Sequence, residues 1–171
     1  ANNRMAHNIS GTADQNVKVL RRLLVDIDPE RPSGVSSSNH EHDFAIEHAR
    51  HIKDVLCKEG WPEPLLGDSG NGAHLVYRLP DLANSPDNVD LLKRVLQGLN
   101  QRFMVHRDGV MLKIDEKVFN PSRISKIYGT LARKGQPLKD RPHRQARILS
   151  GTDPEGVLTL EQLKSIAAVD G

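Results

Sequence analysis

The stretch LLVDIDPERP, residues 23–32, is an apolar run that carries two carboxylates. Successive side chains of a strand point to opposite faces, so Val25 and Ile27 share one face and Asp26 and Asp28 share the other. At about 3.3 Å rise per residue the two carboxylates are expected roughly 6–7 Å apart. Like charges at that spacing repel each other unless a cation lies between them. Pro29 ends the predicted strand, so the alternative is a solvated strand end, where acids are common.

This stretch belongs to a chain with the composition of a globular protein. The 171 residues are 37% hydrophobic and 27% charged, which predicts one domain with a hydrophobic core. The one cysteine, Cys57, excludes an internal disulfide and a cysteine-based zinc site, as is typical of the reducing cytoplasm. No apolar run has the length of a membrane span, and the first residues do not form a signal peptide. We therefore expect a soluble cytoplasmic protein with no membrane partner.

The charge of the chain is unevenly distributed. A net charge of +2 gives by itself no reason to expect a nucleic-acid partner. Between residues 121 and 147, however, the only acid is Asp140. The basic residues of this segment are Arg123, Lys126, Arg133, Lys134, Lys139, Arg141, Arg144 and Arg147. This predicts a local basic surface.

Strands and helices alternate along the chain. A capping box at Ser38 and the apolar spacing after it predict a helix up to Gly60. Ser85 and Pro86 begin a second helix that runs to Phe103. The predicted strands cover residues 19–28, 64–67, 73–79, 110–115 and 143–149, with a helical turn at 121–126 and a closing helix from Thr159. The pattern predicts an α+β fold with helices on one face of the sheet.

The second informative stretch is GDSGNGAHL, residues 67–75. Its three glycines, Gly72 among them, allow the backbone to come close to a ligand, and Ser69 and Asn71 add short polar side chains. A phosphate fits such a loop, and His74 at the start of the next strand could donate a hydrogen bond to it. The alternative is an ordinary hairpin turn with a surface histidine.

Asp115 ends another apolar strand, as Asp28 does. A third carboxylate is what a site for two bridged cations needs, although a solvated strand end is again the alternative. Arg123 and Lys126 stand three residues apart, so on a helical turn they share a face suited to phosphate oxygens. The alternative for this pair is a solvated helix surface.

These stretches, in this order, resemble the archaeo-eukaryotic primase superfamily, in particular the primase-polymerase domains of phage, plasmid and CRISPR-associated systems. The resemblance runs from about residue 2 to residue 149. It rests on NNRM (2–5), VDIDPERPSGVS (25–36), DSGNGAHLVYR (68–78), FNPSRISKIYGT (119–130), ARKG (132–135) and RPHR (141–144). An ordered set of motifs is more specific than any one of them.

The resemblance implies an RRM-like catalytic sheet and a template-dependent nucleotidyltransferase. It implies that Asp26, Asp28 and Asp115 are the catalytic acids and bind two Mg²⁺ or Mn²⁺ ions. The nucleotide-binding residues would be Ser69, Asn71, Gly72, His74, Arg123, Lys126 and Lys134. The uneven charge of the chain adds a further expectation, that Arg133, Arg141, Arg144 and Arg147 line the path of the template and primer. The alternatives are that these residues close over the triphosphate or are only solvated.

The resemblance also implies partners and a domain organisation. The substrates would be dNTPs or NTPs and a DNA template-primer, and the parent protein would carry helicase, replication or CRISPR modules in a prokaryotic, phage or plasmid setting. Residues 1–150 would form the catalytic core and 151–171 a closing helix. Related domains generally have further strands before NNRM, so we expect this chain to be an N-terminally trimmed core.

Parts of the sequence also fit two other functions. His40 and His42 flank Glu41 as in the His-x-His motif of rolling-circle nicking enzymes, for which Tyr77 or Tyr128 would be the nucleophile. The central residue is charged and the pair falls in the first turn of a helix, so these histidines, like His48 and His51, are predicted to be solvated. The other is a non-catalytic RRM-like module that reads bases by stacking. Only 4% of the residues are aromatic, and acids occupy the strands instead.

Overall fold

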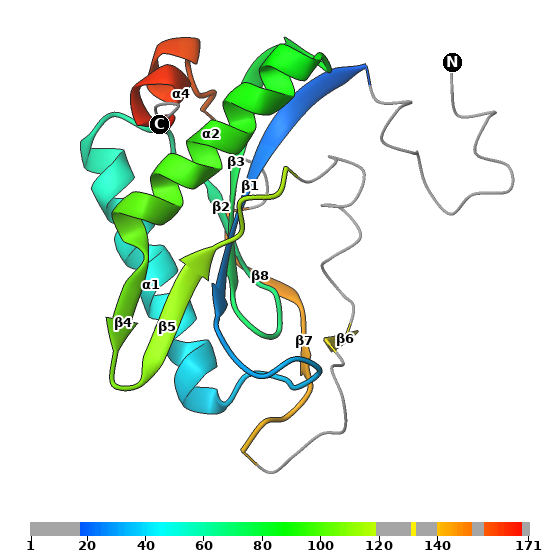
Figure 1. Cartoon of the computed structure of the whole chain (residues 1–171), viewed down its shortest axis with the longest axis vertical. Coiled ribbons are helices and arrows are strands. Elements are labelled where there is room, and N and C mark those ends of the chain that lie inside the picture. Colours follow the sequence, from blue (N-terminus) through cyan, green and yellow to red (C-terminus); the bar gives the residue numbers. More distant parts are fainter. Residues whose placement is uncertain (1–17, 119–130, 133–139, 152–155, 169–171) are drawn as a thin grey trace, which may run out of the picture.

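The fold is described from a computed structural model, which covers residues 18–118, 131–132, 140–151 and 156–168. The elements in chain order are β1 (Val19–Pro29), α1 (Asn39–Lys58), β2 (Leu65–Asp68), β3 (Ala73–Ala83), α2 (Pro86–Phe103), β4 (Val105–Arg107), β5 (Val110–Ile114), β6 (Leu131–Ala132), β7 (Arg144–Gln145), β8 (Arg147–Ser150) and α4 (Leu160–Ile166). Figure 1 shows their arrangement.

Six of the strands form one antiparallel sheet in the order β4-β5-β1-β3-β2-β8. The run β1-α1-β2-β3-α2-β5 is the β-α-β-β-α-β arrangement, in which each helix connects two strands that enclose a third. The predicted α+β, RRM-like sheet is therefore confirmed, and β1 and β3 lie at its centre.

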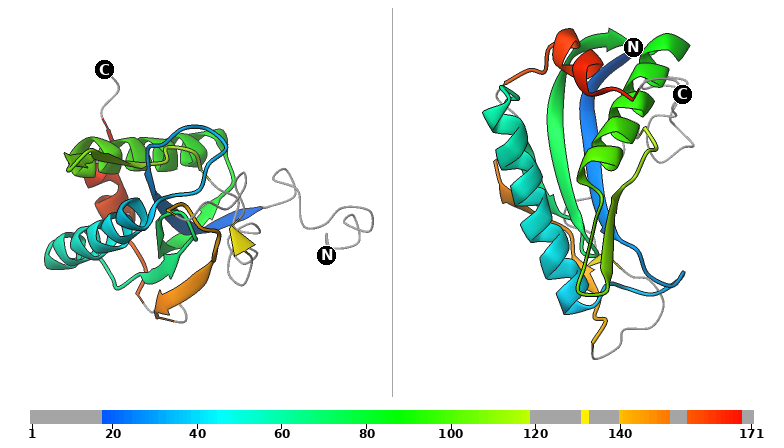
Figure 2. Two further views of the ribbon diagram at one scale, coloured as in Figure 1. Left: turned by 90° about the horizontal axis from the view of Figure 1, so that it is seen from below. Right: turned by 60° about the vertical axis from the view of Figure 1, so that its left-hand side comes forward.

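Both long helices pack on the same face of the sheet. In β1, Val25 and Ile27 point to this face and are fully buried. They form one hydrophobic core with Leu75 and Tyr77 of β3 and with the apolar stripes of α1 and α2. Figure 2 shows both helices on one side of the sheet. The predicted placement of the helices is thereby confirmed.

The helix boundaries follow the predicted capping signals. Ser38 caps α1 through a complete capping box with Glu41, and the chain leaves the helix at Gly60, whose φ is +96°. Ser85 caps α2, with Pro86 in its first turn. Thr159 caps α4 through a second complete capping box.

The last helix joins the same core. Leu158 and Leu163 are fully buried, and the Leu158 amide donates to the Arg78 carbonyl of β3. Gly98 of α2 allows the close approach, because a Cβ there would lie 1.9 Å from the Ile166 carbonyl oxygen.

The structure differs from the predicted elements at several points. The predicted strand at 143–149 is divided: β7 pairs with β6, which was not predicted, in a separate two-stranded sheet, and β8 extends the main sheet beside β2. β3 runs to Ala83, beyond its predicted end at residue 79. The short edge strand β4 was not predicted, because its sequence VHR has no apolar alternation. The predicted helical turn at 121–126 lies outside the described residues.

Candidate functional site

The acids of β1 lie on the face of the sheet opposite the helices, as their alternation predicted. The Asp26 side chain is 21% exposed and the Asp28 side chain 42% exposed. Ile27, between them, is fully buried in the helix-covered core. The side chains of β1 that point toward the helices therefore lie in the core, and those on the opposite face include the two carboxylates.

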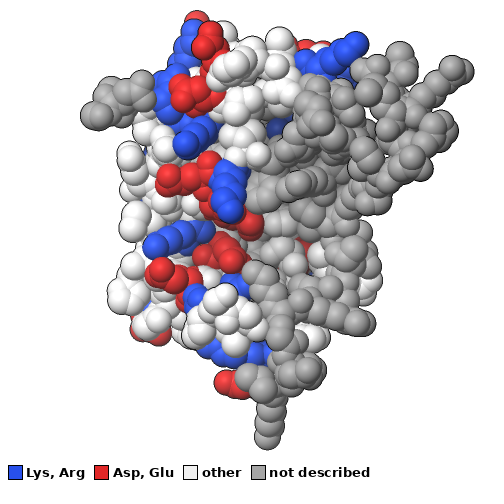
Figure 3. Space-filling view, turned by 45° about the vertical axis from the view of Figure 1, so that its right-hand side comes forward, with Lys and Arg blue, Asp and Glu red and all other residues white. Residues whose placement is uncertain are grey.

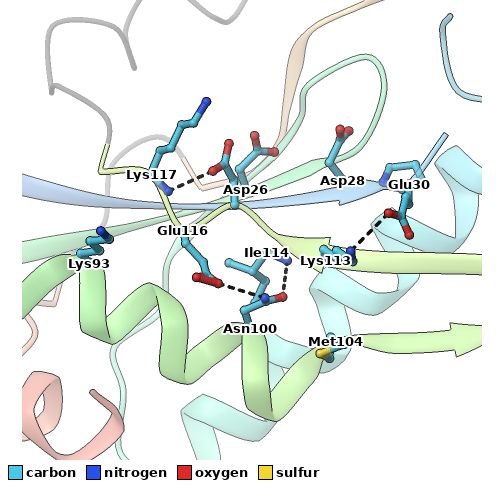
Figure 4. Close-up of a pocket in the computed structure, with 12 residues that line it drawn as sticks. Asp26, Asp28, Glu30, Lys93, Asn100, Met104, Lys113, Ile114, Glu116 and Lys117 are labelled. Carbon is cyan, nitrogen blue, oxygen red and sulfur yellow. Dashed lines mark hydrogen bonds and ion pairs between the residues drawn. The ribbon is translucent and has the colours of Figure 1, made fainter. Parts of the chain in front are cut away.

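Asp115 joins these two acids because β5 is the neighbour of β1. The two strands are antiparallel with Ile27 opposite Ile114, and the Asp115 amide donates to the Asp26 carbonyl at 3.0 Å. All three predicted acids line one open cavity of about 650 Å³ (Figure 4). Its other lining residues are Pro29, Glu30, Lys93, Asn100, Met104, Lys113, Ile114, Glu116 and Lys117.

The carboxylates already contact other groups of the protein. Asp28 accepts a hydrogen bond from the Arg31 guanidinium at 3.0 Å, and the Asp115 carboxylate accepts one from the Lys117 amide at 2.9 Å. Asp26 Oδ1 lies 3.4 Å from His74 Nε2. Within the described part of the chain no three His, Cys, Asp or Glu side chains are gathered closely enough to hold a metal ion.

The structure adds two residues that sequence reasoning missed. The Arg31 side chain is only 6% exposed and also donates to the Pro29 and Val35 carbonyls, so it fixes Asp28. Asn100 of α2 accepts from the Ile114 amide at 2.9 Å and donates to Glu116, which fastens the end of β5 just before Asp115. The i,i+3 spacing to Asp28 was the available signal for Arg31. Asn100 gave no such signal, because its partners are distant in sequence.

His74 is placed directly beside the acids. It pairs with Asp26 across β1 and β3, so the two side chains share the open face of the sheet. The residue is buried, which restricts the orientation of its ring. The alternative of a surface histidine is therefore wrong, while its contact with a phosphate stays a prediction.

The loop of residues 69–72, between β2 and β3, packs against β1. A Cβ at Gly72 would lie 2.2 Å from the Ile27 carbonyl oxygen, so only glycine permits this approach. The Ser69 hydroxyl accepts from the Gly72 amide, and the Asn71 side-chain oxygen accepts from the Ser37 amide. Ser69 and Asn71 thus hold the loop together and to its neighbour, with Asn71 buried.

The predicted basic residues fall into two groups. Arg141 donates to Glu41 and to the Ser36 carbonyl, and Arg144 donates to the carbonyls of Ser37 and Gly70. Burial lowers the pKa of Arg144, while nearby acids, Asp68 first among them, counteract this effect. Arg141 and Arg144 therefore connect loops within the protein.

Arg147 differs from them, because its side chain is 70% exposed. In the view of Figure 3, acidic and basic side chains of the described residues are interspersed and do not separate into two patches. Arg123, Lys126, Arg133 and Lys134 lie outside the described residues.

The prediction that the histidines of α1 are solvated is wrong for two of them. The His42 side chain is only 12% exposed, and its Nε2 lies 2.9 Å from Asp68 Oδ2. His48 donates to the Phe103 carbonyl at 2.6 Å, and burial is the main cause that lowers its pKa. Both side chains meet elements distant in sequence, which helical spacing does not reveal. His40 and His51 are exposed as predicted.

The two histidines of the His-x-His motif do not face a common site. His40 and His42 are two residues apart on a helix and so point about 200° apart. Tyr77 is fully buried in the core, and this burial is the main reason that its pKa is raised. Tyr128 lies outside the described residues.

Comparison with known proteins gives no family for the chain. It matches no protein-family model, no curated protein and no solved structure. Among the described helices, none has the length and apolar character needed to cross a membrane. Function has to be inferred from the residues of the open face.

Proposed function

We propose that the chain is the core of a template-dependent nucleotidyltransferase, a primase-polymerase that adds nucleotides from dNTPs or NTPs to a primer 3′-hydroxyl. One observation supports this most strongly. Asp26, Asp28 and Asp115 come from two adjacent strands and line one cavity, with His74 next to Asp26 on the same face. The order of motifs in the sequence points to the same chemistry.

The donor atoms of the cavity are of the kind that binds divalent cations, although the three carboxylates are not gathered closely enough in this structure to hold one. Carboxylate oxygens are the ligands that Mg²⁺ and Mn²⁺ prefer, and Asp26, Asp28 and Asp115 would hold the ions. When bound, the ions would stabilise the charge of the transferring phosphoryl group and make the primer hydroxyl more acidic. Arg31 keeps Asp28 oriented, and Asn100 fixes the backbone that carries Asp115.

The nucleotide would meet the loop of residues 69–72 and His74. Because Ser69 and Asn71 use hydrogen bonds to hold the loop, their proposed role is to keep it in shape for the triphosphate. The buried His74 would donate a hydrogen bond to a phosphate oxygen from a fixed position. Arg123, Lys126 and Lys134 remain proposed contacts of the triphosphate.

The template and primer would run along the basic segment. Among the described residues of the predicted template path, Arg147 is the one suited to meet a backbone phosphate, because its side chain is exposed. Arg141 and Arg144 would support that surface by fixing the loops beside it. Arg133 remains a proposed contact of the nucleic acid.

A primer-extension assay tests the proposal. The chain is incubated with a labelled primer on a DNA template, all eight nucleotides, and Mg²⁺ or Mn²⁺, with EDTA as the control. We expect metal-dependent extension past the primer end. Absence of extension under all conditions, combined with metal-independent binding of single strands, would instead favour a stacking module.

A further inference from the structure

The loop that we assign to the triphosphate, residues 69–72, is attached to the first turn of α1 by a contact between Asp68 and His42. Asp68 immediately precedes this loop and is buried. One of its carboxylate oxygens accepts from the Gly70 amide at 2.7 Å, and the other lies 2.9 Å from His42 Nε2. The carboxylate thus joins the loop backbone to the helix.

Both ring nitrogens of His42 face a carboxylate. Nε2 lies 2.9 Å from Asp68 Oδ2, and Nδ1 lies 3.2 Å from the exposed Asp43 Oδ1. An ionised carboxylate only accepts hydrogen bonds, so Nε2 is the donor in the contact with Asp68. Because the acceptor is ionised, this hydrogen bond is charge-assisted.

The charged groups near this contact are weaker partners of Asp68. Arg147 lies 3.8 Å from the same oxygen, but its side chain is 70% exposed. Arg144 donates to the Gly70 carbonyl and to the Asn39 side chain, so its hydrogen bonds hold the loop and not the carboxylate. Glu41 is occupied by Arg141. His42 is therefore the closest side-chain partner of Asp68 that the structure shows.

The loop attached in this way meets the acid-lined cavity. Gly72 lies against β1, where an added Cβ would be 3.1 Å from Asp28 Oδ1 and 3.2 Å from Asp28 Cα. A displacement of the loop away from α1 would change its position relative to Asp28 and His74.

We propose that His42 and Asp68 form a clamp that positions the triphosphate loop over the acids, and that His42 is a positioning residue for nucleotide binding. The expected effect on nucleotide binding rests on the proposed function. The contact between His42 and Asp68 does not depend on that function. His42 makes no contact with the acids of the cavity, so its loss should weaken nucleotide binding more than the chemical step.

The test compares His42→Ala and Asp68→Asn with His42→Gln, whose amide can still donate toward Asp68. His40→Ala is the matched control, because His40 is exposed in the same helical turn. Amide hydrogen exchange is followed for residues 66–76. Binding of a non-hydrolysable dATP analogue with Mn²⁺ is measured by calorimetry, and KM and kcat are measured in primer extension.

We expect His42→Ala to speed exchange in the loop and to raise both the Kd of the analogue and the KM about tenfold, with kcat within about twofold of wild type. His42→Gln should restore most of the loss, and His40→Ala should behave as wild type. Unchanged loop exchange in His42→Ala would overturn the clamp. Faster exchange with unchanged Kd would overturn its role in nucleotide binding. A wild-type chain that binds no triphosphate would overturn the proposed function, while the exchange data still decide whether the clamp exists.

Discussion

The two faces of the central sheet differ in composition and in the work that they do. The face under α1 and α2 carries Val25, Ile27, Leu75 and Tyr77, all of them fully buried or nearly so. The opposite face of the same strands carries the acids of β1, and His74 stands beside them. Residues that stabilise the fold and residues proposed for the chemistry thus alternate along one strand. Substitutions on the helix-covered face should therefore lower stability, and substitutions on the open face should lower activity.

The largest difference in stability is expected between neighbours in β1. Ile27→Ala removes a fully buried side chain from the core and should cost about 2–5 kcal/mol of unfolding free energy. Asp26→Asn, on the open face, should change it by less than about 1 kcal/mol. Urea unfolding followed by circular dichroism measures both. Equal losses in the two variants would contradict the division of the faces.

The contact between the loop and the sheet gives the next largest effect. Gly72→Ala places a Cβ within 2.2 Å of the Ile27 carbonyl oxygen. Backbone atoms cannot move aside as a flexible side chain can, so we expect a loss of about 3 kcal/mol. Gly109→Ala is the control, because a Cβ added there would meet open space. The positive φ of residue 109 is then the only source of destabilisation, about 1 kcal/mol of unfolding free energy. Unfolding curves of similar midpoint for the two variants would contradict the close approach.

The basic residues test whether the segment after residue 140 is structural or exposed for binding. Arg144→Ala leaves carbonyls of two loops without their guanidinium donor and should cost about 1–3 kcal/mol. Arg147→Ala should cost less than about 0.5 kcal/mol, because its side chain is exposed.

The same two variants should differ in nucleic-acid binding. Loss of Arg147 should flatten the dependence of log K on log[salt] by close to 0.9 for each duplex phosphate contact removed. Fluorescence anisotropy with a labelled primer-template across a salt series measures the slope. An unaltered slope in Arg147→Ala would remove this residue from the template path.

The smallest predicted effect is a pH dependence of stability. Burial raises the pKa of Asp68, but the hydrogen bonds from His42 and Gly70 outweigh it, so the folded-state pKa lies below the ordinary value of an aspartate. The stabilisation is therefore fully present above that value and is lost as pH falls through it toward the folded-state pKa. Thermal unfolding of wild type should lose more stability on acidification than Asp68→Asn does. If the stability of wild type and of Asp68→Asn falls equally with pH, Asp68 is not held in its ionised form.

Much of the fold was accessible from the sequence because its signals are local. Capping boxes at Ser38 and Thr159 and the apolar spacing in α1 and α2 mark the helices. The alternation in VDID assigned the side chains of residues 25–28 of β1 to the correct faces. Asp115 was expected beside the other acids, and the pairing of β1 with β5 accounts for this.

The remaining features depend on contacts between distant segments. His42 meets Asp68, and Asn100 meets the Ile114 amide, across gaps in the sequence that no periodicity spans. Arg141 and Arg144 were expected to bind nucleic acid because of their charge, but the structure shows them joined to loop carbonyls. Charge alone cannot distinguish a guanidinium that binds a ligand from one that satisfies its own backbone.

The most direct test of the account is the activity of the three acid variants, measured beside their stability. Asp26→Asn, Asp28→Asn and Asp115→Asn are assayed for primer extension at saturating Mn²⁺, with Asp81→Asn as an exposed acidic control on β3. The account predicts folded proteins in which each cavity variant loses extension by at least about a thousandfold, the several kcal/mol expected of metal-assisted phosphoryl transfer, while Asp81→Asn retains full activity. Extension at the wild-type rate in any cavity variant would show that its carboxylate does not serve the chemistry of the open face.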